Sequence, residues 1–414
     1  MDKLLDKYAQ LVVCTGVNLQ KNQLLVINAP LECADFARRI AKAAFEAGAE
    51  DVKVNWSDEL LAKLRLEEAR AEVFDEFPAW RRDMFMDFKE KGAAIVSIHA
   101  SDPLIFQSAS PDKLLRSQRA AGKALLEYRQ AMMNNELRWC VVSVPTAAWA
   151  KRVFDQEPDG SRAVAKLWQA IFRSVRLDGE QNPVQAWQQH IDFLQRACRF
   201  MNEQQFTALC YRNSLGTDLQ VKLPAGHIWA GGAEIAADGV QFAANMPTEE
   251  IYTLPDRNGA DGVVYASKPL NYNGSLICGM RLEFQSGRVV RAEAAEGQEL
   301  LEKLLSVDEG AAFLGEVALV PYDSPISQSG ILFYNTLFDE NAACHLAFGK
   351  AYPTCLQGGE KMDSVELAEH GVNDSLIHED FMIGTADLEI VGVRADGTEV
   401  QVFQNGNFVI FGDG

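Results

Sequence analysis

Five side chains in the second half of the chain have the chemistry to bind a pair of divalent metal ions. They are Glu250, Glu316, His345, His378 and Asp380. Zinc, cobalt and manganese accept mixed sets of carboxylate and imidazole ligands, and two such ions a few ångströms apart form a hydrolytic centre. No local signature such as HExxH links these residues in the sequence. The fold must therefore bring them together.

The two histidines lie in segments for which the sequence predicts different structures. His378 and Asp380 are two residues apart, and alternate side chains of an extended strand point to the same side. The segment 341–352 is predicted to be a helix, in which His345 and Tyr352 emerge on one face because seven residues make almost two turns. The alternatives are a core histidine bonded to the backbone and a solvated polar strand.

The remaining carboxylates are harder to place. Glu316 lies inside the apolar run 313–320, where a lone carboxylate is costly to bury without a partner, although a strand edge would leave it exposed. Glu249 and Glu250 follow Pro247 and point to opposite sides if the chain is extended. Spacing does not show which one faces inward. For Glu249 we expect surface exposure, with a role as general base as the alternative.

The first half of the chain alternates strand-like and helix-like segments. Strands are predicted at 24–28, 51–56, 93–99 and 139–144, and helices at 34–47, 59–71, 80–91, 114–135, 146–154, 163–175 and 184–203. Short apolar strands separated by helices are typical of βαβ units. The sequence therefore predicts an α/β N-terminal domain with a largely parallel sheet, over residues 1–203.

The pattern changes near residue 205. Strands are predicted at 206–212, 218–223, 262–267, 276–284 and 289–293, a hairpin turn at 285–287, helices at 297–305 and 341–352, and a closing meander from 387 to 410. Strands joined by short turns favour antiparallel pairing. We predict a mixed, mostly antiparallel α+β catalytic domain that binds the metal, over residues 204–414.

Composition narrows the class of protein. The chain has 414 residues and a net charge of −19, with no basic stripe, which argues against nucleic acid as a partner. Eight dispersed cysteines without a CxxC pair indicate free thiols in a reducing compartment. The apolar patch 11–13 is too short for a signal peptide, and no apolar run is long enough for a membrane span. We therefore expect a cytoplasmic protein.

Three segments together resemble one known family. They are NMPTEE (245–250), FDENAACHLA (338–347) and NDSLIHEDFMIG (373–384). In this order they closely resemble the aminopeptidase T family, also called thermophilic or PepS-type metalloaminopeptidases. The likeness runs essentially end to end and includes KYA (7–9), AGA (47–49) and LGTDL (215–219).

The resemblance implies specific roles for residues of this chain. It implies that the metal is bound by Glu250, Glu316, His345, His378 and Asp380, with Glu340 at a further position associated with the metal site. Tyr352 falls at the active-site tyrosine. The family likeness further implies an N-terminal α/β domain, a C-terminal catalytic domain and a homodimer.

The predicted function is the removal of N-terminal amino acids from peptides with a free N-terminus. Two divalent ions, zinc, cobalt or manganese, would supply a metal-bound hydroxide as the nucleophile. Glu316 is our choice for the carboxylate that bridges the ions, and Tyr352 would assist the oxyanion or the leaving amine. Two alternatives stay open, namely a dinuclear dipeptidase or amidohydrolase on small amides, and a non-enzymatic dimeric scaffold with a structural metal.

Overall fold

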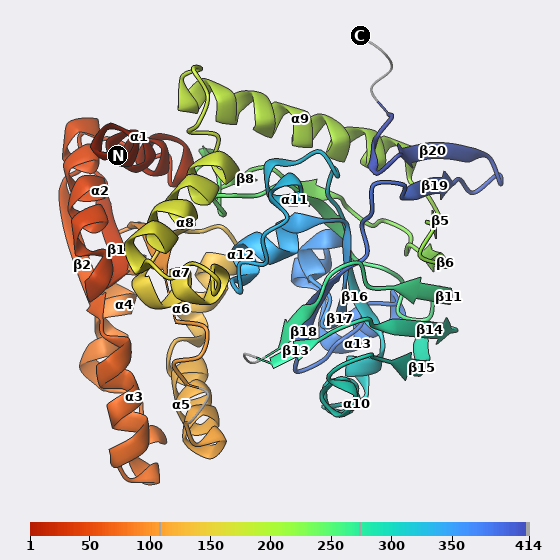
Figure 1. The fold of residues 1–414 in the computed structure, drawn as a ribbon, viewed down its shortest axis with the longest axis horizontal. Helices are drawn as coiled ribbons and strands as arrows, with labels where there is room; N and C mark the ends of the chain where they lie inside the picture. Colours follow the sequence, from red (N-terminus) through yellow and green to blue (C-terminus); the bar gives the residue numbers. More distant parts are fainter. Residues whose placement is uncertain (101, 107–108, 273–274, 411–414) are drawn as a thin grey trace. The chain divides into compact units, whose positions relative to one another are not determined.

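The computed structural model describes residues 1–100, 102–106, 109–272 and 275–410 (Figure 1). The chain forms two units, Met1–Gln189 with Ala233–Pro247, and His190–Gly232 with Thr248–Gly414. The predicted domain boundary at Glu203 lies near the end of helix α9 (Pro183–Gln204) and stays a prediction.

A four-stranded parallel sheet forms the centre of the first unit. Its order is β2-β1-β3-β4, with β1 Leu24–Pro30, β2 Asp51–Ser57, β3 Ala94–His99 and β4 Trp139–Ser143. The middle strands β1 and β3 are almost wholly buried, as expected for a parallel sheet that helices cover on both faces. All four strands were predicted from the sequence, and the predicted α/β class is confirmed.

The first unit also contains a series of helices, several of which cover this sheet. They are α1 (Asp2–Leu11), α2 (Ala34–Ala47), α3 (Glu59–Glu68), α4 (Ala79–Glu90), α5 (Pro111–Ala124), α6 (Leu126–Met133), α7 (Ala147–Val153), α8 (Gly160–Ser174) and the first part of α9. Phe88 of α4 packs with Val26 and Ile95 of the sheet. The prediction of one helix over 114–135 is wrong, because the helix breaks at Leu125, whose φ of −106° and ψ of 17° are not helical. The Leu125 side chain at this break is buried.

Two antiparallel sheets build the second unit. The larger has the order β15-β14-β11-β6-β5-β19-β20-β21 and the smaller has the order β18-β17-β16-β10-β7. The larger sheet comprises β5 (Ala208–Arg212), β6 (Asp218–Lys222), β11 (Ala260–Tyr265), β14 (Arg281–Gln285), β15 (Arg288–Glu293), β19 (Glu389–Val393), β20 (Glu399–Gln404) and β21 (Asn407–Phe408). The smaller sheet comprises β7 (Ala230–Gly231), β10 (Ile251–Thr253), β16 (Leu314–Leu319), β17 (His345–Gly349) and β18 (His378–Met382). The predicted antiparallel class, the hairpin at 285–287 and the closing meander are confirmed.

Shorter elements complete both units. They are the hairpins β8 (Glu234–Ile235) with β9 (Gln241–Phe242) and β12 (Leu270–Tyr272) with β13 (Ser275–Ile277), and helices α10 (Gln298–Leu305), α11 (Pro325–Ser329), α12 (Thr336–Asp339) and α13 (Ser364–Glu369). Both sheets of the second unit contribute to one apolar core, in which Phe348 and Phe381 of the smaller sheet join Leu209 and Ile390 of the larger. Within the described part of the chain, no helix has the length and apolar character needed to cross a membrane.

Candidate metal centre

The smaller sheet of the second unit is apolar on one face and carries the candidate ligands on the other. Side chains alternate along each strand. Leu346, Phe348 and Phe381 therefore enter the core, whereas His345 projects to the opposite side. The strands β16, β17 and β18 lie next to one another (Figure 1). Residues far apart in the sequence thus become neighbours on a single surface.

The register of the strands determines which side chains meet. Asp380 and Glu316 both pair with Ala347, one from each neighbouring strand, so all three side chains point to the same face. His378 pairs with Gly349 in the next row. Because the middle strand contributes only a methyl group and a glycine here, the carboxylates and the imidazole can converge across it.

A β-bulge orients Glu316. The pairing of β16 with β17 shifts between Leu314 and Glu316, which places Gly315 in the bulge. A Cβ at Gly315 would lie 2.4 Å from the carbonyl oxygen of Gly349, so only glycine fits this approach. The Glu316 side chain that follows is buried, although the sequence alone left an exposed strand edge open.

The five predicted ligands form two groups that share one carboxylate. Glu250, Glu316 and His345 make the first group, and Glu316, His378 and Asp380 make the second. The Nε2 atom of His345 lies 3.3 Å from Oε2 of Glu250 and 3.3 Å from Oε1 of Glu316. The Nε2 atom of His378 lies 3.7 Å from Oε2 of Glu316 and 3.5 Å from Oδ1 of Asp380. The two oxygens of Glu316 therefore face different histidines.

Backbone carbonyls orient both imidazoles. The Nδ1 atom of His345 lies 3.2 Å from the carbonyl oxygen of Ala343, and that of His378 lies 2.7 Å from the carbonyl oxygen of Lys350. A carbonyl can only accept a hydrogen bond, so each Nδ1 carries a proton and each Nε2 is directed at the carboxylates. Metal-binding histidines are usually held in this way by their second ring nitrogen.

The charges of the cluster shift the pKa values of the two imidazoles upward. Burial alone lowers the pKa of His345, but its hydrogen bond with Glu316 and the charges of Asp380 and Glu250 outweigh burial and raise the pKa to about 10. Burial likewise lowers the pKa of His378, but its interactions with the carboxylates, mainly with Asp380, outweigh burial and raise the pKa to about 9. Without a metal, both imidazoles thus take up protons that offset the negative charge of the carboxylates.

The carboxylates of the cluster respond to burial and to one another. Burial raises the pKa of Glu250 to about 7, and the charges of Glu316 and Asp380 add to this increase. Burial also raises the pKa of Glu340 well above its usual value, again with help from Glu250 and Asp380. For Asp380, the close approach of His378 and the positive charges of both histidines outweigh burial and lower the pKa. Glu340 therefore lies within electrostatic range of the two groups, although it belongs to neither.

The arrangement fits divalent ions better than it fits simple ion pairs. Charge-assisted N–H···O bonds are about 2.7–2.9 Å long, whereas the imidazole-to-carboxylate separations here are 3.3–3.9 Å. Two ligand atoms that each lie about 2.1 Å from a tetrahedral ion are about 3.4 Å apart. Within the described residues, the buried Oδ1 atom of Asp380 has no hydrogen-bond partner. The donor set, the spacing and this oxygen all suit metal binding.

The helix predicted over 341–352 is wrong. His345 begins strand β17, and Leu346 and Phe348 alternate with it in the two-residue period of a strand. The alanines before His345 resembled a helical sequence, but burial of the alternating apolar side chains in the core prevails. Tyr352 nevertheless reaches the site from the turn after β17. Its ring centroid lies 4.8 Å from that of His378, and its side chain is 37% exposed.

The expected surface exposure of Glu249 is also wrong. Glu249 is buried, and its carboxylate lies 3.6 Å from Nε2 of His190. The same imidazole nitrogen lies 2.7 Å from the carbonyl oxygen of Thr248. Glu249 thus faces away from the two groups, and Glu250 faces into them.

Asn341 is a residue of the site that sequence reasoning missed. Its side chain is fully buried. The Oδ1 atom accepts a hydrogen bond of 2.7 Å from the N–H of Glu249, and Nδ2 donates to the carbonyl of Leu337 at 3.1 Å and to Oε1 of Glu340 at 3.4 Å. One amide thus connects the segment that carries Glu250 to Glu340. No local pattern of the sequence indicated this contact, which joins segments about ninety positions apart.

Two overlapping groups of imidazole and carboxylate donors on one face of a sheet form a candidate site for divalent metal, of the kind that metallohydrolases use. The model of the thermophilic metalloprotease (M29) family matches residues 1–408, and the chain belongs to that family. The chain is 47% identical over 407 residues to Aminopeptidase 2 of Geobacillus stearothermophilus, with 98% of each chain covered.

Other relatives agree. Aminopeptidase T of Thermus aquaticus is 40% identical over 406 residues, with 98% of each chain covered. The solved structure of wild-type AmpT from Thermus thermophilus superimposes with a TM-score of 0.91 at 38% identity and covers 99% of each chain. These comparisons confirm the resemblance to the aminopeptidase T family, the fold class and the predicted class of enzyme. Membership of a metalloprotease family also means that the enzyme needs a divalent metal.

Proposed function

We propose that the protein is a metal-dependent aminopeptidase that removes amino acids from the N-terminus of peptides and holds two divalent ions. The observation that carries the proposal is the position of Glu316, whose Oε1 atom faces His345 and whose Oε2 atom faces His378. A carboxylate in this position is suited to bridge two ions. Membership of a metalloprotease family supports hydrolysis of peptides, and the aminopeptidase names of the relatives support action at the N-terminus.

Each ion would have its own ligands besides the shared carboxylate. Glu250 and His345 would hold one ion, His378 and Asp380 the other, and Glu316 both. Glu340 lies beside these groups, and we keep it as a further candidate ligand. When bound, zinc, cobalt or manganese would polarise the scissile carbonyl and lower the pKa of a water molecule to about 7, which makes a hydroxide nucleophile accessible at neutral pH.

Tyr352 is proposed to donate a proton or a hydrogen bond during the reaction. Its ring lies against that of His378, at the border of the site. Partial burial raises the pKa of Tyr352, and the charges of Glu316 and Asp380 raise it further, so the phenol keeps its proton at neutral pH. A protonated phenol in this place can donate to the oxyanion that develops on the scissile carbonyl or to the leaving amine.

The free amino group of the substrate is the feature that an internal peptide bond lacks. The site concentrates the carboxylates of Glu250, Glu316, Glu340 and Asp380 in a small volume. A carboxylate of this group can accept a hydrogen bond from the amino group of the substrate. The proposal therefore predicts that substrates with a blocked N-terminus are not cleaved.

The central experiment compares aminoacyl anilides that carry a free amine with their N-acetylated forms. Hydrolysis of the free forms should stop after chelation and return when zinc, cobalt or manganese is added. Equal hydrolysis of the acetylated forms would instead indicate an amidohydrolase. Absence of any metal-dependent hydrolysis, with metal bound, would indicate a structural site.

A matched pair of histidine variants tests the assignment of the site. We expect His345→Ala to lower metal content and to abolish turnover while the secondary structure stays intact. His370→Ala is the control, because His370 is exposed and belongs to neither ligand group. Full activity of His345→Ala at unchanged metal content would remove the central claim.

Location and assembly belong to the same proposal. All eight cysteines are free, which suits a reducing cytoplasm. The family resemblance implies a homodimer. Sedimentation velocity at several protein concentrations would show whether the dimer forms, and a monomer across the range would contradict it.

A further inference from the structure

A pocket of about 140 Å³ opens beside the metal centre. One wall is β18, with His378, Glu379, Asp380 and Met382. The facing walls are residues 269–271, which include the start of β12, together with Leu332, Thr336, Asp339 and Glu340. The pocket thus has candidate metal ligands at one side and no assigned role.

The free edge of β18 borders this pocket. Lys350 N–H donates to the Ile377 carbonyl at 2.7 Å and Ile383 N–H donates to the Cys344 carbonyl at 2.8 Å. Alternation along the strand then directs the backbone groups of residues 378, 380 and 382 away from β17. The outer carbonyl of Met382 accepts from Ser267 N–H at 2.8 Å. Within the described residues, no partner from another segment is found for the outer carbonyls of residues 378 and 380.

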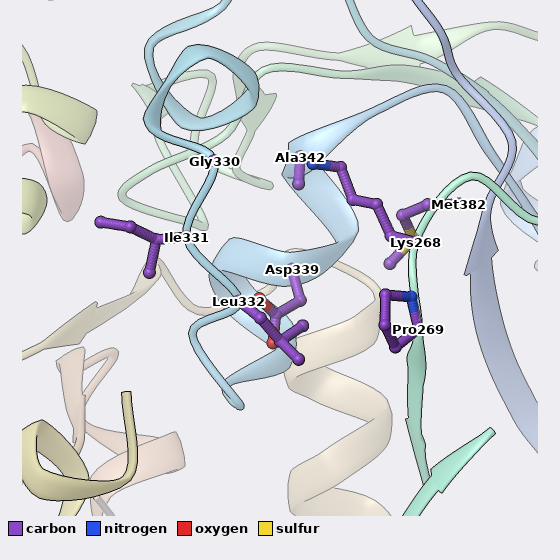
Figure 2. A pocket seen from close by; sticks show the side chains of 8 residues that line it. All are labelled: Lys268, Pro269, Gly330, Ile331, Leu332, Asp339, Ala342 and Met382. Carbon is purple, nitrogen blue, oxygen red and sulfur yellow. The ribbon is translucent and has the colours of Figure 1, made fainter. Parts of the chain in front are cut away.

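A second pocket, of about 100 Å³, adjoins the first. Pro269, Leu332, Asp339 and Met382 line both pockets. Figure 2 shows Lys268, Pro269 and Met382 on one side of the second pocket, with Leu332 and Asp339 on the other. The side chain of Ile331 points away from them. The shared walls make the second pocket an extension of the first.

The shared walls favour an uncharged side chain. Pro269, Leu332 and Met382 present apolar surface to both pockets. The carboxylate of Asp339 accepts hydrogen bonds from the N–H groups of Phe333, at 2.7 Å, and Asn335, at 2.9 Å, so it is already occupied.

Charged side chains find less favourable surroundings. An anionic side chain would meet Asp339 and Glu340 in the first pocket. A cationic side chain would have carboxylates beside it in the first pocket, but at the length of lysine or arginine its charge would enter the second pocket and meet the ammonium of Lys268. In both cases the charge ends beside a like charge in a partly enclosed space, which is unfavourable.

We propose that the first pocket is the subsite for the side chain of the substrate's first residue, and that it selects an apolar side chain such as that of leucine or methionine. The main chain of that residue would lie along the free edge of β18, where extended peptides commonly add to a sheet. This inference rests on the proposed aminopeptidase function and specifies its substrate class.

Substitutions of Leu332 test the subsite, because Leu332 is only partly buried and lines both pockets. Metal-loaded wild type, Leu332→Trp and Leu332→Ala are assayed on alanyl, leucyl, phenylalanyl, lysyl and glutamyl anilides. Leu215→Trp and Leu215→Ala are the matched controls, since Leu215 is 46% exposed and lines neither pocket. Metal content and thermal unfolding are measured for every variant.

The wild type should cleave the leucyl anilide with kcat/KM at least about tenfold above that of the alanyl anilide, since one methylene group in an apolar pocket already provides that much. It should also prefer the leucyl anilide to the lysyl and glutamyl anilides, whose charges meet like charges in the pockets. Leu332→Trp fills the pocket and should lower kcat/KM for the leucyl anilide about tenfold, with a much smaller effect on the alanyl anilide. Leu332→Ala should raise the phenylalanyl-to-leucyl ratio. The Leu215 variants should match the wild type.

Calorimetry with free leucine and free alanine gives a second readout, in which Leu332→Trp should weaken only leucine binding. An active wild type that prefers lysyl or glutamyl anilides overturns the apolar selection. If the Leu332 variants change kcat/KM for all substrates by one common factor, the assignment of the subsite is wrong, while the aminopeptidase function stands. A metal-loaded wild type that cleaves none of the anilides overturns the aminopeptidase function, and the subsite with it.

Discussion

Replacement of Asn341 by leucine should weaken metal binding although Asn341 lies in neither ligand group. Leucine has nearly the same shape as asparagine but neither donates nor accepts hydrogen bonds. The substitution removes the acceptor of the Glu249 N–H and the donor to the Glu340 carboxylate. The segment that carries Glu249 and Glu250 would then lose its contact with Glu340, and the two candidate ligands Glu250 and Glu340 would no longer be held in place relative to each other.

Two magnitudes follow from these contacts. The buried N–H of Glu249 would be left without a partner, which costs about 1–3 kcal/mol in the free energy of unfolding. Loss of a partner that orients metal ligands typically weakens metal binding about 10–100-fold, which corresponds to about 1.4–2.7 kcal/mol. The first effect lowers the stability of the metal-free protein, and the second lowers its affinity for the metal.

The assay must separate these two effects. Metal affinity is measured by competition with a chromogenic chelator, and stability by urea unfolding of the metal-free protein. Asn202→Leu is the control, because Asn202 makes a similar pair of bonds, accepting from Trp229 N–H at 2.8 Å and donating to its carbonyl at 3.0 Å. Asn202 belongs to neither ligand group.

The expected result is that both variants lose stability and that only Asn341→Leu loses metal affinity. If Asn341→Leu loses stability but binds metal as tightly as the wild type, the amide is merely structural and the reasoning is refuted. If Asn202→Leu loses the same metal affinity, the effect reports general destabilisation.

Four further predictions concern the same centre. The pKa values of His345 and His378, about 10 and about 9, leave both imidazoles protonated in the metal-free protein at neutral pH. Metal binding should therefore release protons, and metal affinity should rise between pH 6 and pH 9. Calorimetry in buffers of different ionisation enthalpy measures the proton release, and the absence of any release would contradict the prediction. In the metal-free protein these raised pKa values contribute stability below about pH 6.5 that is lost as the pH rises through 9 and 10, which urea unfolding across this range would show. Ala347→Leu should place a bulky side chain between the facing carboxylates and reduce bound metal in elemental analysis, whereas Ala347→Ser should retain it. Tyr352→Phe should lower kcat by roughly 100–1000-fold at unchanged metal content, as for loss of an oxyanion donor; an unchanged kcat would assign the ring to packing.

Local pattern predicted much of the fold correctly. The strands of the first unit are short apolar runs between helical segments, and both features depend on neighbouring residues in the chain. The pair His378 and Asp380 was likewise readable, because a two-residue spacing in a strand is enough to place both side chains on one face. The segment at His345 shows where this method fails. Its alanines favour a helix, and only the burial of Leu346 and Phe348 in the shared core makes it a strand.

The sequence by itself determined the chemical types of the candidate ligands, the alternation of strands and helices, and the family. The tertiary structure decided which carboxylates face the site. In the segment just before β10, Glu250 turns inward and Glu249 turns to His190, because contacts with residues distant in sequence, such as Asn341 and His190, fix the backbone and the side chain there. The convergence of Glu316 and Asp380 across Ala347 is a matter of register between three strands, and register depends on hydrogen bonds between segments distant in sequence. The two overlapping ligand groups therefore arise from the packing of the whole unit, which no local pattern contains.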